Sequence, residues 1–455
     1  MTLPEDFIRE TRLLMGEARF NRFLGAFDEE APVSIRVNPR FSRKEEGGRR
    51  KENSPSTGLS ENTTAADSME ESILIPHSSF LIPRNKVPWC SEGYYLSGRP
   101  QFTFDPLFHA GCYYVQEAAS MFITHVLREL SNLIPHSSFL RPFGSKRPWA
   151  ERLLPRNILD LCAAPGGKST AMRTVLPEGS VLVSNEPIPT RVQILLENIT
   201  KWGWPDCIVT NNYPRDFRKA KMTFDLILCD VPCSGEGMFR KDPATISEWS
   251  LQNVEKCWRL QREIVADAWE CLNPGGILIY STCTYNIKEN EENVRWILET
   301  YDAEALTIPT DPSWNITGSL LPGFNAPVYR FIPGITRSEG LFMCVLRKFG
   351  STGVRGHGGA RYDYKQIKGL SILVPPYHRA PVPPTVDLSY QDALSYLRGE
   401  ALVLPPDTPR GIVTVTYRGV PLGPAKNIGP RANNLYPKPW RIKSTHLPSE
   451  PPIII

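Results

Sequence analysis

The chain has 455 residues, of which 41% are hydrophobic and 22% charged, as in a globular protein with two or three domains. Its formal net charge of +4 does not by itself indicate a nucleic-acid partner, and 43 prolines and 32 glycines indicate long loops and linkers. No apolar run predicts a membrane helix and no C-x-x-C pair indicates a zinc or redox site, so we expect a cytoplasmic protein with reduced thiols, no metal and no membrane contact.

The N-terminal region predicts two helices and a strand. Apolar residues at helical spacing over 4–26, with Gly16 as a break, favour two short helices. Residues 32–39, PVSIRVNP, then alternate apolar and polar side chains, which is typical of a half-buried strand. This strand would present a basic outer face that carries Arg36.

Two segments read as insertions. From about 42 to 86 the composition becomes charged and rich in serine and threonine, which predicts a flexible insertion. The octapeptide LIPHSSFL at 74–81 recurs at 133–140, and we expect a second inserted segment at about 131–150. Two copies are too few for a solenoid, and the histidine in each copy has no accompanying ligand set for a metal.

The middle of the chain alternates helical and strand-like stretches. An amphipathic helix is expected over 115–130. Further along lie strand-like runs and, between them, helical stretches: strands at 181–184, 207–210, 224–229 and 276–281, and helices at 190–202 and 254–272. This alternation predicts an α/β fold with a parallel sheet, whose ligands bind beyond the carboxyl ends of the strands.

A glycine-rich loop at 157–170, NILDLCAAPGGKST, has the pattern of a strand, a tight loop and a helix. Gly166 and Gly167 allow a ligand to lie against the backbone at the start of the helix. Cys162 stands where a P-loop requires glycine, and the dinucleotide motif G-x-G-x-x-G is absent. A pocket for S-adenosylmethionine remains, or a turn that binds no ligand.

Polar residues follow the next strands at the edge where a ligand would bind. Glu186, about 20 positions past the glycines, is suited to accept the hydroxyls of a ribose. Asp230 and Cys233 follow the strand at 224–229, and Cys283 follows the strand at 276–281. Two thiols at the ends of neighbouring strands are unusual for core cysteines, and the expected compartment disfavours a disulfide.

Three motifs together carry a family resemblance: CAAPGGK at 162–168, DVPCSGEGMFRKDP at 230–243 and STCTYNIKENE at 281–291. With them the chain resembles the Nop/Sun (RsmB/RsmF-type) family of RNA cytosine-5 methyltransferases, and within it the RsmF-like ribosomal RNA enzymes. The resemblance implies a Rossmann-like core that uses S-adenosylmethionine. It also implies that Cys283 is the nucleophile and that Cys233 helps the product to leave.

The chemistry of such a reaction indicates roles for the remaining residues. A thiolate adds to C6 of cytosine, which makes C5 nucleophilic, and Asp230 would bind the N3/N4 edge of the base and supply a proton. The cofactor would be held by Glu186, Arg191, Asp230 and the loop residues Cys162, Ala163, Ala164, Pro165, Gly166, Gly167 and Lys168. Tyr213 departs from the family pattern, in which an aspartate often faces the adenosine, and Asp216 or a backbone amide is a possible substitute.

The domains expected are an N-terminal α+β RNA-binding region at 1–112, a methyltransferase core at 113–348, a linker at 349–385 and a β-rich PUA-like RNA-binding domain at 386–455. In the last of these, basic residues alternate with two aromatic ones that are suited to stacked bases: Lys426, Arg431, Tyr436, Lys438, Trp440 and Arg441. Arg36 is a further candidate RNA contact.

We expect a monomer that acts on ribosomal RNA or a ribosomal subunit particle. The alternatives are the same chemistry on transfer RNA, or an RNA-binding assembly factor without activity.

Overall fold

The computed structural model describes residues 2–41, 85–133, 157–350, 367, 369–373 and 384–455. The predicted insertion at 42–86, the segment at 131–150, much of the linker and both LIPHSSFL copies except Leu133 therefore lie outside the described residues.

The largest sheet of the described chain has nine strands in the order β10-β12-β9-β8-β5-β6-β7-β13, with β11 added beside β12. Its five central strands are parallel and confirm the predicted α/β fold: β5 (Asn157–Asp160), β6 (Val181–Asn185), β7 (Cys207–Thr210), β8 (Phe224–Asp230) and β9 (Leu272–Thr282). The outer strands are β10 (Ala303–Ala305), β11 (Tyr329–Phe331), β12 (Leu341–Lys348) and β13 (Ile372–Leu373). The direction of winding reverses at β5, which places the topological switch point between β5 and β8.

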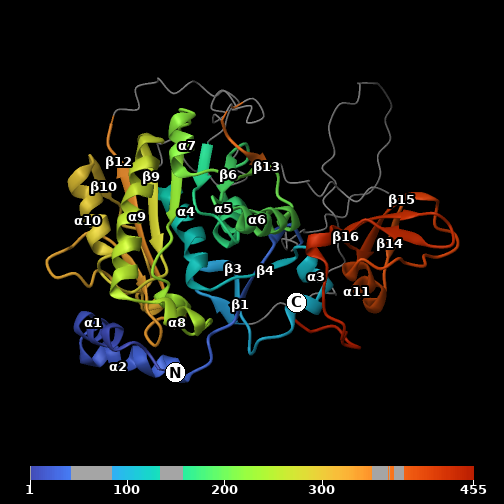
Figure 1. The fold of residues 1–455 in the computed structure, drawn as a ribbon, viewed down its shortest axis with the longest axis horizontal. Coiled ribbons are helices and arrows are strands. Elements are labelled where there is room, and N and C mark those ends of the chain that lie inside the picture. The colour runs from blue at the N-terminus through green and yellow to red at the C-terminus, as the bar shows by residue number, and fades with distance from the viewer. Residues whose placement is uncertain (1, 42–84, 134–156, 351–366, 368, 374–383) are drawn as a thin grey trace, which may run out of the picture.

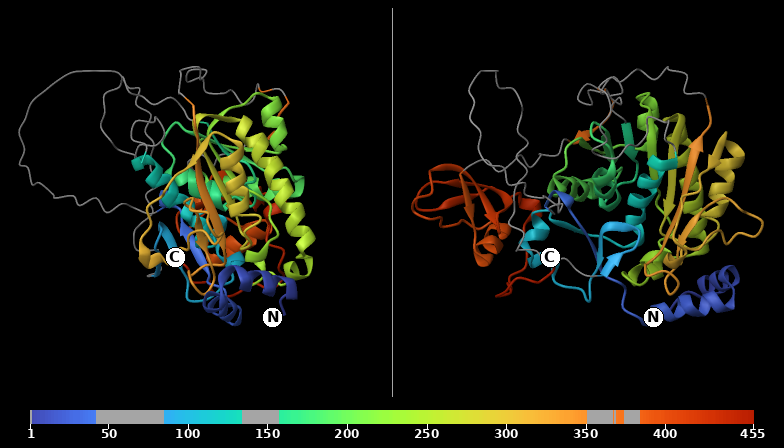
Figure 2. Two further views of the ribbon diagram at one scale, coloured as in Figure 1. Left: turned by 90° about the vertical axis from the view of Figure 1, so that its left-hand side faces the viewer. Right: turned by 180° about the vertical axis from the view of Figure 1, so that it is seen from behind.

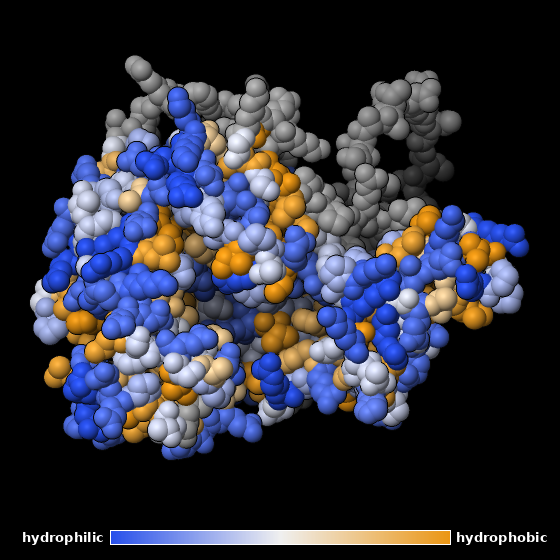
Figure 3. Space-filling view, viewed as in Figure 1, coloured by the Kyte–Doolittle hydropathy of each residue, from blue (hydrophilic) through white to orange (hydrophobic). Residues whose placement is uncertain are grey.

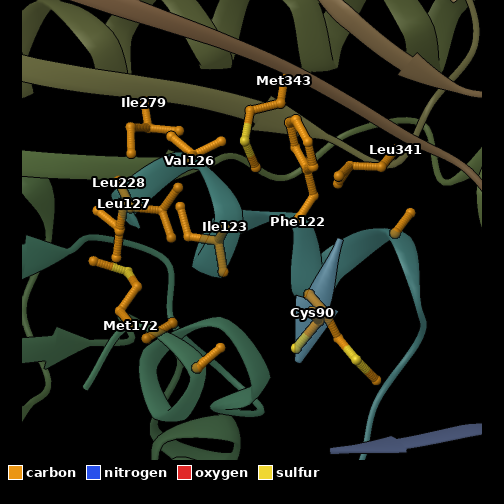
Figure 4. Packing of buried hydrophobic residues seen from close by; sticks show 14 of the residues in the cluster. Cys90, Phe122, Ile123, Val126, Leu127, Met172, Leu228, Ile279, Leu341 and Met343 are labelled. Atoms are coloured by element: carbon orange, nitrogen blue, oxygen red, sulfur yellow. The ribbon is translucent and has the colours of Figure 1, made fainter. Parts of the chain in front are cut away.

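Helices cover both faces of this sheet (Figure 1). One face packs against α4 (Phe122–Leu133), α5 (Gly167–Val175) and α6 (Pro189–Trp202), and Figure 4 shows Phe122 and Val126 against Ile279 and Met343. The other face packs against α7 (Pro214–Lys219), α9 (Leu251–Glu270) and α10 (Glu291–Thr300), while the short α8 (Ala244–Glu248) precedes α9. Alternate residues of each central strand point to opposite faces, so both faces are apolar.

The N-terminal region confirms two predicted helices, α1 (Glu5–Met15) and α2 (Glu17–Gly25), which are separated at Gly16. A four-stranded sheet follows in the order β2-β3-β1-β4, formed by β1 (Ser34–Val37), β2 (Asn85–Val87), β3 (Cys90–Tyr95) and β4 (Tyr113–Val115). The helix expected over 115–130 begins only at Phe122, because Val115 pairs with β1 instead. Between β3 and β4 lies α3 (Pro106–His109).

The C-terminal domain is a separate sheet, β14-β15-β16-β17, formed by β14 (Thr385–Asp387), β15 (Gly411–Tyr417), β16 (Val420–Asn427) and β17 (Ala432–Asn434), with α11 (Tyr390–Arg398). This domain projects to one side of the core in Figure 1 and in the right-hand view of Figure 2. Figure 3 shows a hollow in the surface between the core and this domain. The expected stacking role of Tyr436 is wrong: it is 4% exposed and packs 5.4 Å from Tyr396 in a cluster that includes Tyr113. Within the described residues, no helix is long and apolar enough to cross a membrane.

Candidate active site

The glycine-rich loop connects β5 to α5 as predicted. Gly166 has φ of 113°, a left-handed conformation that residues with a side chain rarely adopt. The loop is held from outside by Arg191, whose guanidinium donates to the carbonyl of Ala164 at 2.9 Å. Arg191, half exposed, therefore positions the loop.

Arg36 supports the same loop from below, and the expectation that it faces solvent is wrong. Its side chain is fully buried and donates to the hydroxyl of Thr170 at 2.6 Å and to the side-chain oxygen of Gln116 at 2.8 Å. The guanidinium also lies 4.3 Å from the ring of Trp202. Burial lowers the pKa of Arg36 to about 10. Both faces of this strand are covered by residues that are distant in sequence. The alternation of apolar and polar side chains along the strand therefore could not reveal that Arg36 is buried.

Two buried carboxylates near the loop each have an oxygen without a hydrogen bond among the described residues. Glu186 is 1% exposed, and one oxygen accepts from the amide of Ile188 while the other lies 3.5 Å from Arg191 without a hydrogen bond. Asp160, the last residue of β5, accepts from Ser169 through one oxygen only. Burial raises the pKa of Asp160 to about 7. Free buried acceptors fit a ligand that brings its own donors.

The structure brings the two predicted cysteines together. Asp230 pairs with Ser281 in neighbouring parallel strands, so the chain leaves β8 and β9 at the same edge. The sulfur atoms of Cys233 and Cys283 lie 3.2 Å apart, and both are free thiols. The hydrogen bond to Cys283 and burial raise the pKa of Cys233 well above its usual range. Cys233 therefore stays protonated in this arrangement.

Lys168, predicted as one of the loop residues that hold the cofactor, also has a side-chain contact that the sequence did not indicate. Its ammonium donates to Asp230 at 2.8 Å. Burial opposes the charge, but the attraction of Asp230 and of Cys283 outweighs it, so the pKa of Lys168 is raised. The lysine of the glycine-rich loop thus connects that loop to the end of β8.

Two further carboxylates, also missed, join the cysteine loops. Glu236 accepts from the backbone amides of Tyr285 and Asn286, at 2.6 and 3.0 Å. Glu289 accepts from the amide of Ser234 at 3.0 Å, and burial together with Glu236 raises its pKa to about 7. Both acids lie inside the motifs that carry the cysteines. A carboxylate in a turn that the fold buries was the sequence signal that could have identified them.

Gly237 fixes the distance between these loops. Its amide donates to the carbonyl of Cys283 at 2.7 Å, and a β-carbon at this position would overlap that oxygen. Tyr213, in contrast, is 56% exposed, and its amide donates to Asp216 at the start of α7. The carboxylate of Asp216 is thereby used as a helix cap.

The strand order, the glycine turn at the switch point and the flanking sheets define a Rossmann-like methyltransferase domain with an N-terminal domain and a C-terminal PUA-like β domain. Family models match residues 152–347 (16S rRNA methyltransferase RsmB/F), 51–118 (N-terminal domain of 16S rRNA methyltransferase RsmF) and 383–442 (methyltransferase RsmF PUA domain). Over residues 152–347 the chain matches the RsmB/F methyltransferase family, and the two flanking ranges match domains of RsmF.

Curated relatives agree with this assignment. The chain is 30% identical over 357 residues to the ribosomal RNA small subunit methyltransferase F of Escherichia coli O81 (strain ED1a), covering 76% of this chain and 63% of that protein. It is 34% identical over 271 residues to the enzyme of the same name from Serratia proteamaculans, covering 58% of this chain and 51% of the relative. The chain thus spans less than two thirds of the length of these relatives.

Two solved structures from Pyrococcus horikoshii share the fold. A methyltransferase homolog protein is 22% identical with a TM-score of 0.52, over 76% of this chain and 100% of that one. NSun6 with SFG is 18% identical with a TM-score of 0.53, over 76% and 99%.

Proposed function

We propose that this protein transfers a methyl group from S-adenosylmethionine to C5 of a cytosine in RNA, through a covalent bond between Cys283 and C6 of the base. The observation that carries the proposal is the pair of thiols 3.2 Å apart, beside the ion pair of Lys168 and Asp230. The names of the relatives favour small-subunit ribosomal RNA as the substrate, free or in a particle.

The residues around the glycine loop fit the cofactor. Glu186 has a buried oxygen free to accept from a ribose hydroxyl, and Asp160 has one free to accept from an ammonium group. The turn at Gly166 exposes backbone amides at the start of α5. Bound here, S-adenosylmethionine supplies an electrophilic methyl group. A structural neighbour holds SFG, an analogue of this cofactor, which supports the assignment.

The two thiols act in sequence. Cys283 adds to C6 as a thiolate. Asp230, in its protonated form, binds the N3/N4 edge of the ring and gives N3 the proton that balances the added charge, and the Lys168 ammonium at 2.8 Å stabilises the carboxylate that remains. Once its sulfur is bound to C6, Cys283 no longer shares a hydrogen bond with Cys233. C5 then takes the methyl group. Cys233, after losing its own proton to solvent, takes the C5 proton as a thiolate. The C5–H electrons re-form the C5=C6 double bond, N3 returns its proton to Asp230, and the bond from C6 to Cys283 breaks with its electron pair on the sulfur.

Single alanine variants separate these roles. Cys283→Ala should abolish both methyl transfer and any protein–RNA adduct. Cys233→Ala should still allow attack and methylation but accumulate an adduct that survives a denaturing gel, because the C5 proton is not removed. The assay uses isotope-labelled cofactor with transcribed small-subunit ribosomal RNA and, in parallel, with transfer RNA, followed by mapping of the labelled base.

Cys271→Ala is the matched control, since Cys271 is buried next to the opposite end of β9 and its loss should cost only about 1 kcal/mol of stability. An adduct with Cys283→Ala but none with Cys233→Ala would reverse the two roles. Label mapped to transfer RNA would change the substrate, and a wild type that binds RNA but transfers no methyl group would indicate an inactive assembly factor.

A further inference from the structure

A cavity of about 460 Å³ lies outside the site described above. It is open to solvent and is lined by the β2–β3 hairpin, which contributes Lys86, Trp89 and Tyr95, and by two loops, which contribute Trp314 and Arg337. Its size is that of a small-molecule or nucleotide site. None of the functions assigned above uses it.

The aromatic walls of this cavity are held in place. Trp89 is 3% exposed and donates its indole N–H to the carbonyl of Ala118 at 2.7 Å. Trp314 meets Trp89 edge to face, with ring centroids 6.1 Å apart, and remains half-buried. The hydroxyl of Tyr95 donates to the carbonyl of Arg337 at 2.7 Å. Trp89 and Tyr95 are 3% and 4% exposed, so they form the base of the cavity and hold Trp314, whose partly exposed ring offers stacking surface without a cost for ordering it.

The charge at the rim is positive. Lys86 and Arg337 are both exposed, and among the described residues neither has an acidic side chain within ion-pair distance. The guanidinium of Arg337 lies 4.1 Å from the ring of Tyr95, and the residues that line the cavity include no carboxylate. Two cations without an acid disfavour a cationic ligand and favour one that combines a flat ring with an anion.

The position of the cavity connects it to the thiols. Arg337 is two residues from Glu339, whose carbonyl accepts from the hydroxyl of Tyr285 at 2.5 Å. The same carbonyl lies 3.3 Å from the position that a β-carbon of Gly237 would occupy. The amide of Gly237 in turn donates a hydrogen bond to the carbonyl of Cys283. The loop that forms one wall of the cavity therefore packs against Gly237 and Tyr285, which flank the Cys283 loop.

We propose that the cavity binds one unpaired nucleotide of the RNA that flanks the base to be methylated. The flanking base stacks on Trp314, and its phosphate lies between Lys86 and Arg337. The base to be methylated must leave its stack to meet Cys283, and this unstacking costs free energy. Binding of the neighbouring nucleotide in the cavity offsets part of that free energy. This inference rests on the proposed function, because it takes RNA as the substrate.

The test uses the full chain and transcribed small-subunit ribosomal RNA, with binding measured by fluorescence anisotropy at several salt concentrations. Lys86→Gln and Arg337→Gln should each weaken binding and lower the slope of log affinity against log salt by about 1. Trp314→Leu should weaken binding by between about 5- and 150-fold, and Trp314→Phe should restore most of the loss. Affinity for S-adenosylmethionine, measured by calorimetry, should not change.

Arg9→Gln is the charge-matched control, since Arg9 is exposed on α1 and should leave RNA affinity unchanged. Unchanged RNA affinity in folded Arg337→Gln and Trp314→Leu would overturn the inference, as would a loss that Arg9→Gln shares. If the variants weaken binding but the wild type transfers no methyl group, the cavity is an RNA site and the proposed function fails alone. If the wild type methylates RNA and the variants match it in KM and affinity, only the cavity assignment fails.

Discussion

Replacing Glu186 by glutamine should shift stability and cofactor affinity in opposite directions. In the ligand-free protein one buried oxygen of Glu186 accepts no hydrogen bond. Such a group costs about 1–3 kcal/mol, of which Arg191 at 3.5 Å offsets only a part because it is half exposed. Removing the charge should therefore stabilise the ligand-free protein by about 1 kcal/mol, a rise in Tm of about 2–4 °C for a domain of 150–250 residues.

The same change should weaken cofactor binding. Hydrogen bonds from ribose hydroxyls to an ionised carboxylate are charge-assisted, and losing them costs about 2–3 kcal/mol in total. That cost corresponds to an affinity for S-adenosylmethionine reduced about 30- to 150-fold. Calorimetric titration measures the affinity, and scanning fluorimetry without cofactor measures the Tm.

Glu178→Gln makes the same chemical change at an exposed position and should alter neither quantity. A Glu186→Gln protein with lower Tm and normal affinity would contradict both expectations. That result would mean that Glu186 serves only to hold the amide of Ile188, to which it is bonded at 3.0 Å.

Three further predictions concern the loops around the thiols. Gly237→Ala should lower methyl transfer at least about 100-fold with normal cofactor affinity, since its β-carbon would displace Cys283. Arg330→Met should lower the free energy of unfolding in urea by about 3–5 kcal/mol because it leaves the buried Glu291 unpaired, and adding Glu291→Leu should recover most of the loss. Burial raises the pKa of Glu289 from 4.5 to about 7, so the folded chain keeps a proton that the unfolded chain releases. The free energy of unfolding should therefore fall by up to about 3 kcal/mol as the pH rises between these two values. Glu289→Gln should flatten this fall, measured as Tm against pH.

Each of these changes has a control or a contradicting result. Gly318→Ala adds a β-carbon with no atom within 4 Å and should keep normal turnover. Arg259→Gln removes an exposed arginine and should cost less than about 1 kcal/mol. A double variant no more stable than Arg330→Met alone would argue against the unpaired charge as the cause. An unchanged pH profile in Glu289→Gln would show that another group titrates in this range.

The elements of the central sheet could be predicted from sequence because they are local signals. Strands buried on both faces read as continuous apolar runs, and the predicted runs at 181–184, 207–210 and 224–229 match β6, β7 and β8 within one residue at each end. The helix expected from Val115 failed for a non-local reason. Val115 is extended because it pairs with Ile35, which lies 80 positions earlier in the chain. Helical periodicity around Val115 carries no information about this pairing.

The buried polar residues were out of reach for the same reason. Arg36 has the side chain of a surface residue and is hidden by contacts with Gln116, Thr170 and Trp202, all distant in sequence. Tyr436 stands among basic residues, yet its ring packs on the C-terminal domain's own core. Composition predicts what a side chain prefers, whereas these positions are set by which surfaces the fold brings together.

The approach of the two thiols follows from strand register. Asp230 in β8 stands opposite Ser281 in β9. Cys233 follows Asp230 by three residues and Cys283 follows Ser281 by two, so both thiols lie at the same edge of the sheet. A slip of one residue between β8 and β9 would turn every side chain of one strand to the opposite face, and the apolar packing on both faces forbids it. The cores on the two faces therefore fix the geometry of the site, and Glu236 and Glu289 only set the last few ångströms. On this reasoning, core variants that preserve volume should leave the thiol pair intact, whereas changes to the two carboxylates should alter the reaction before they alter the fold.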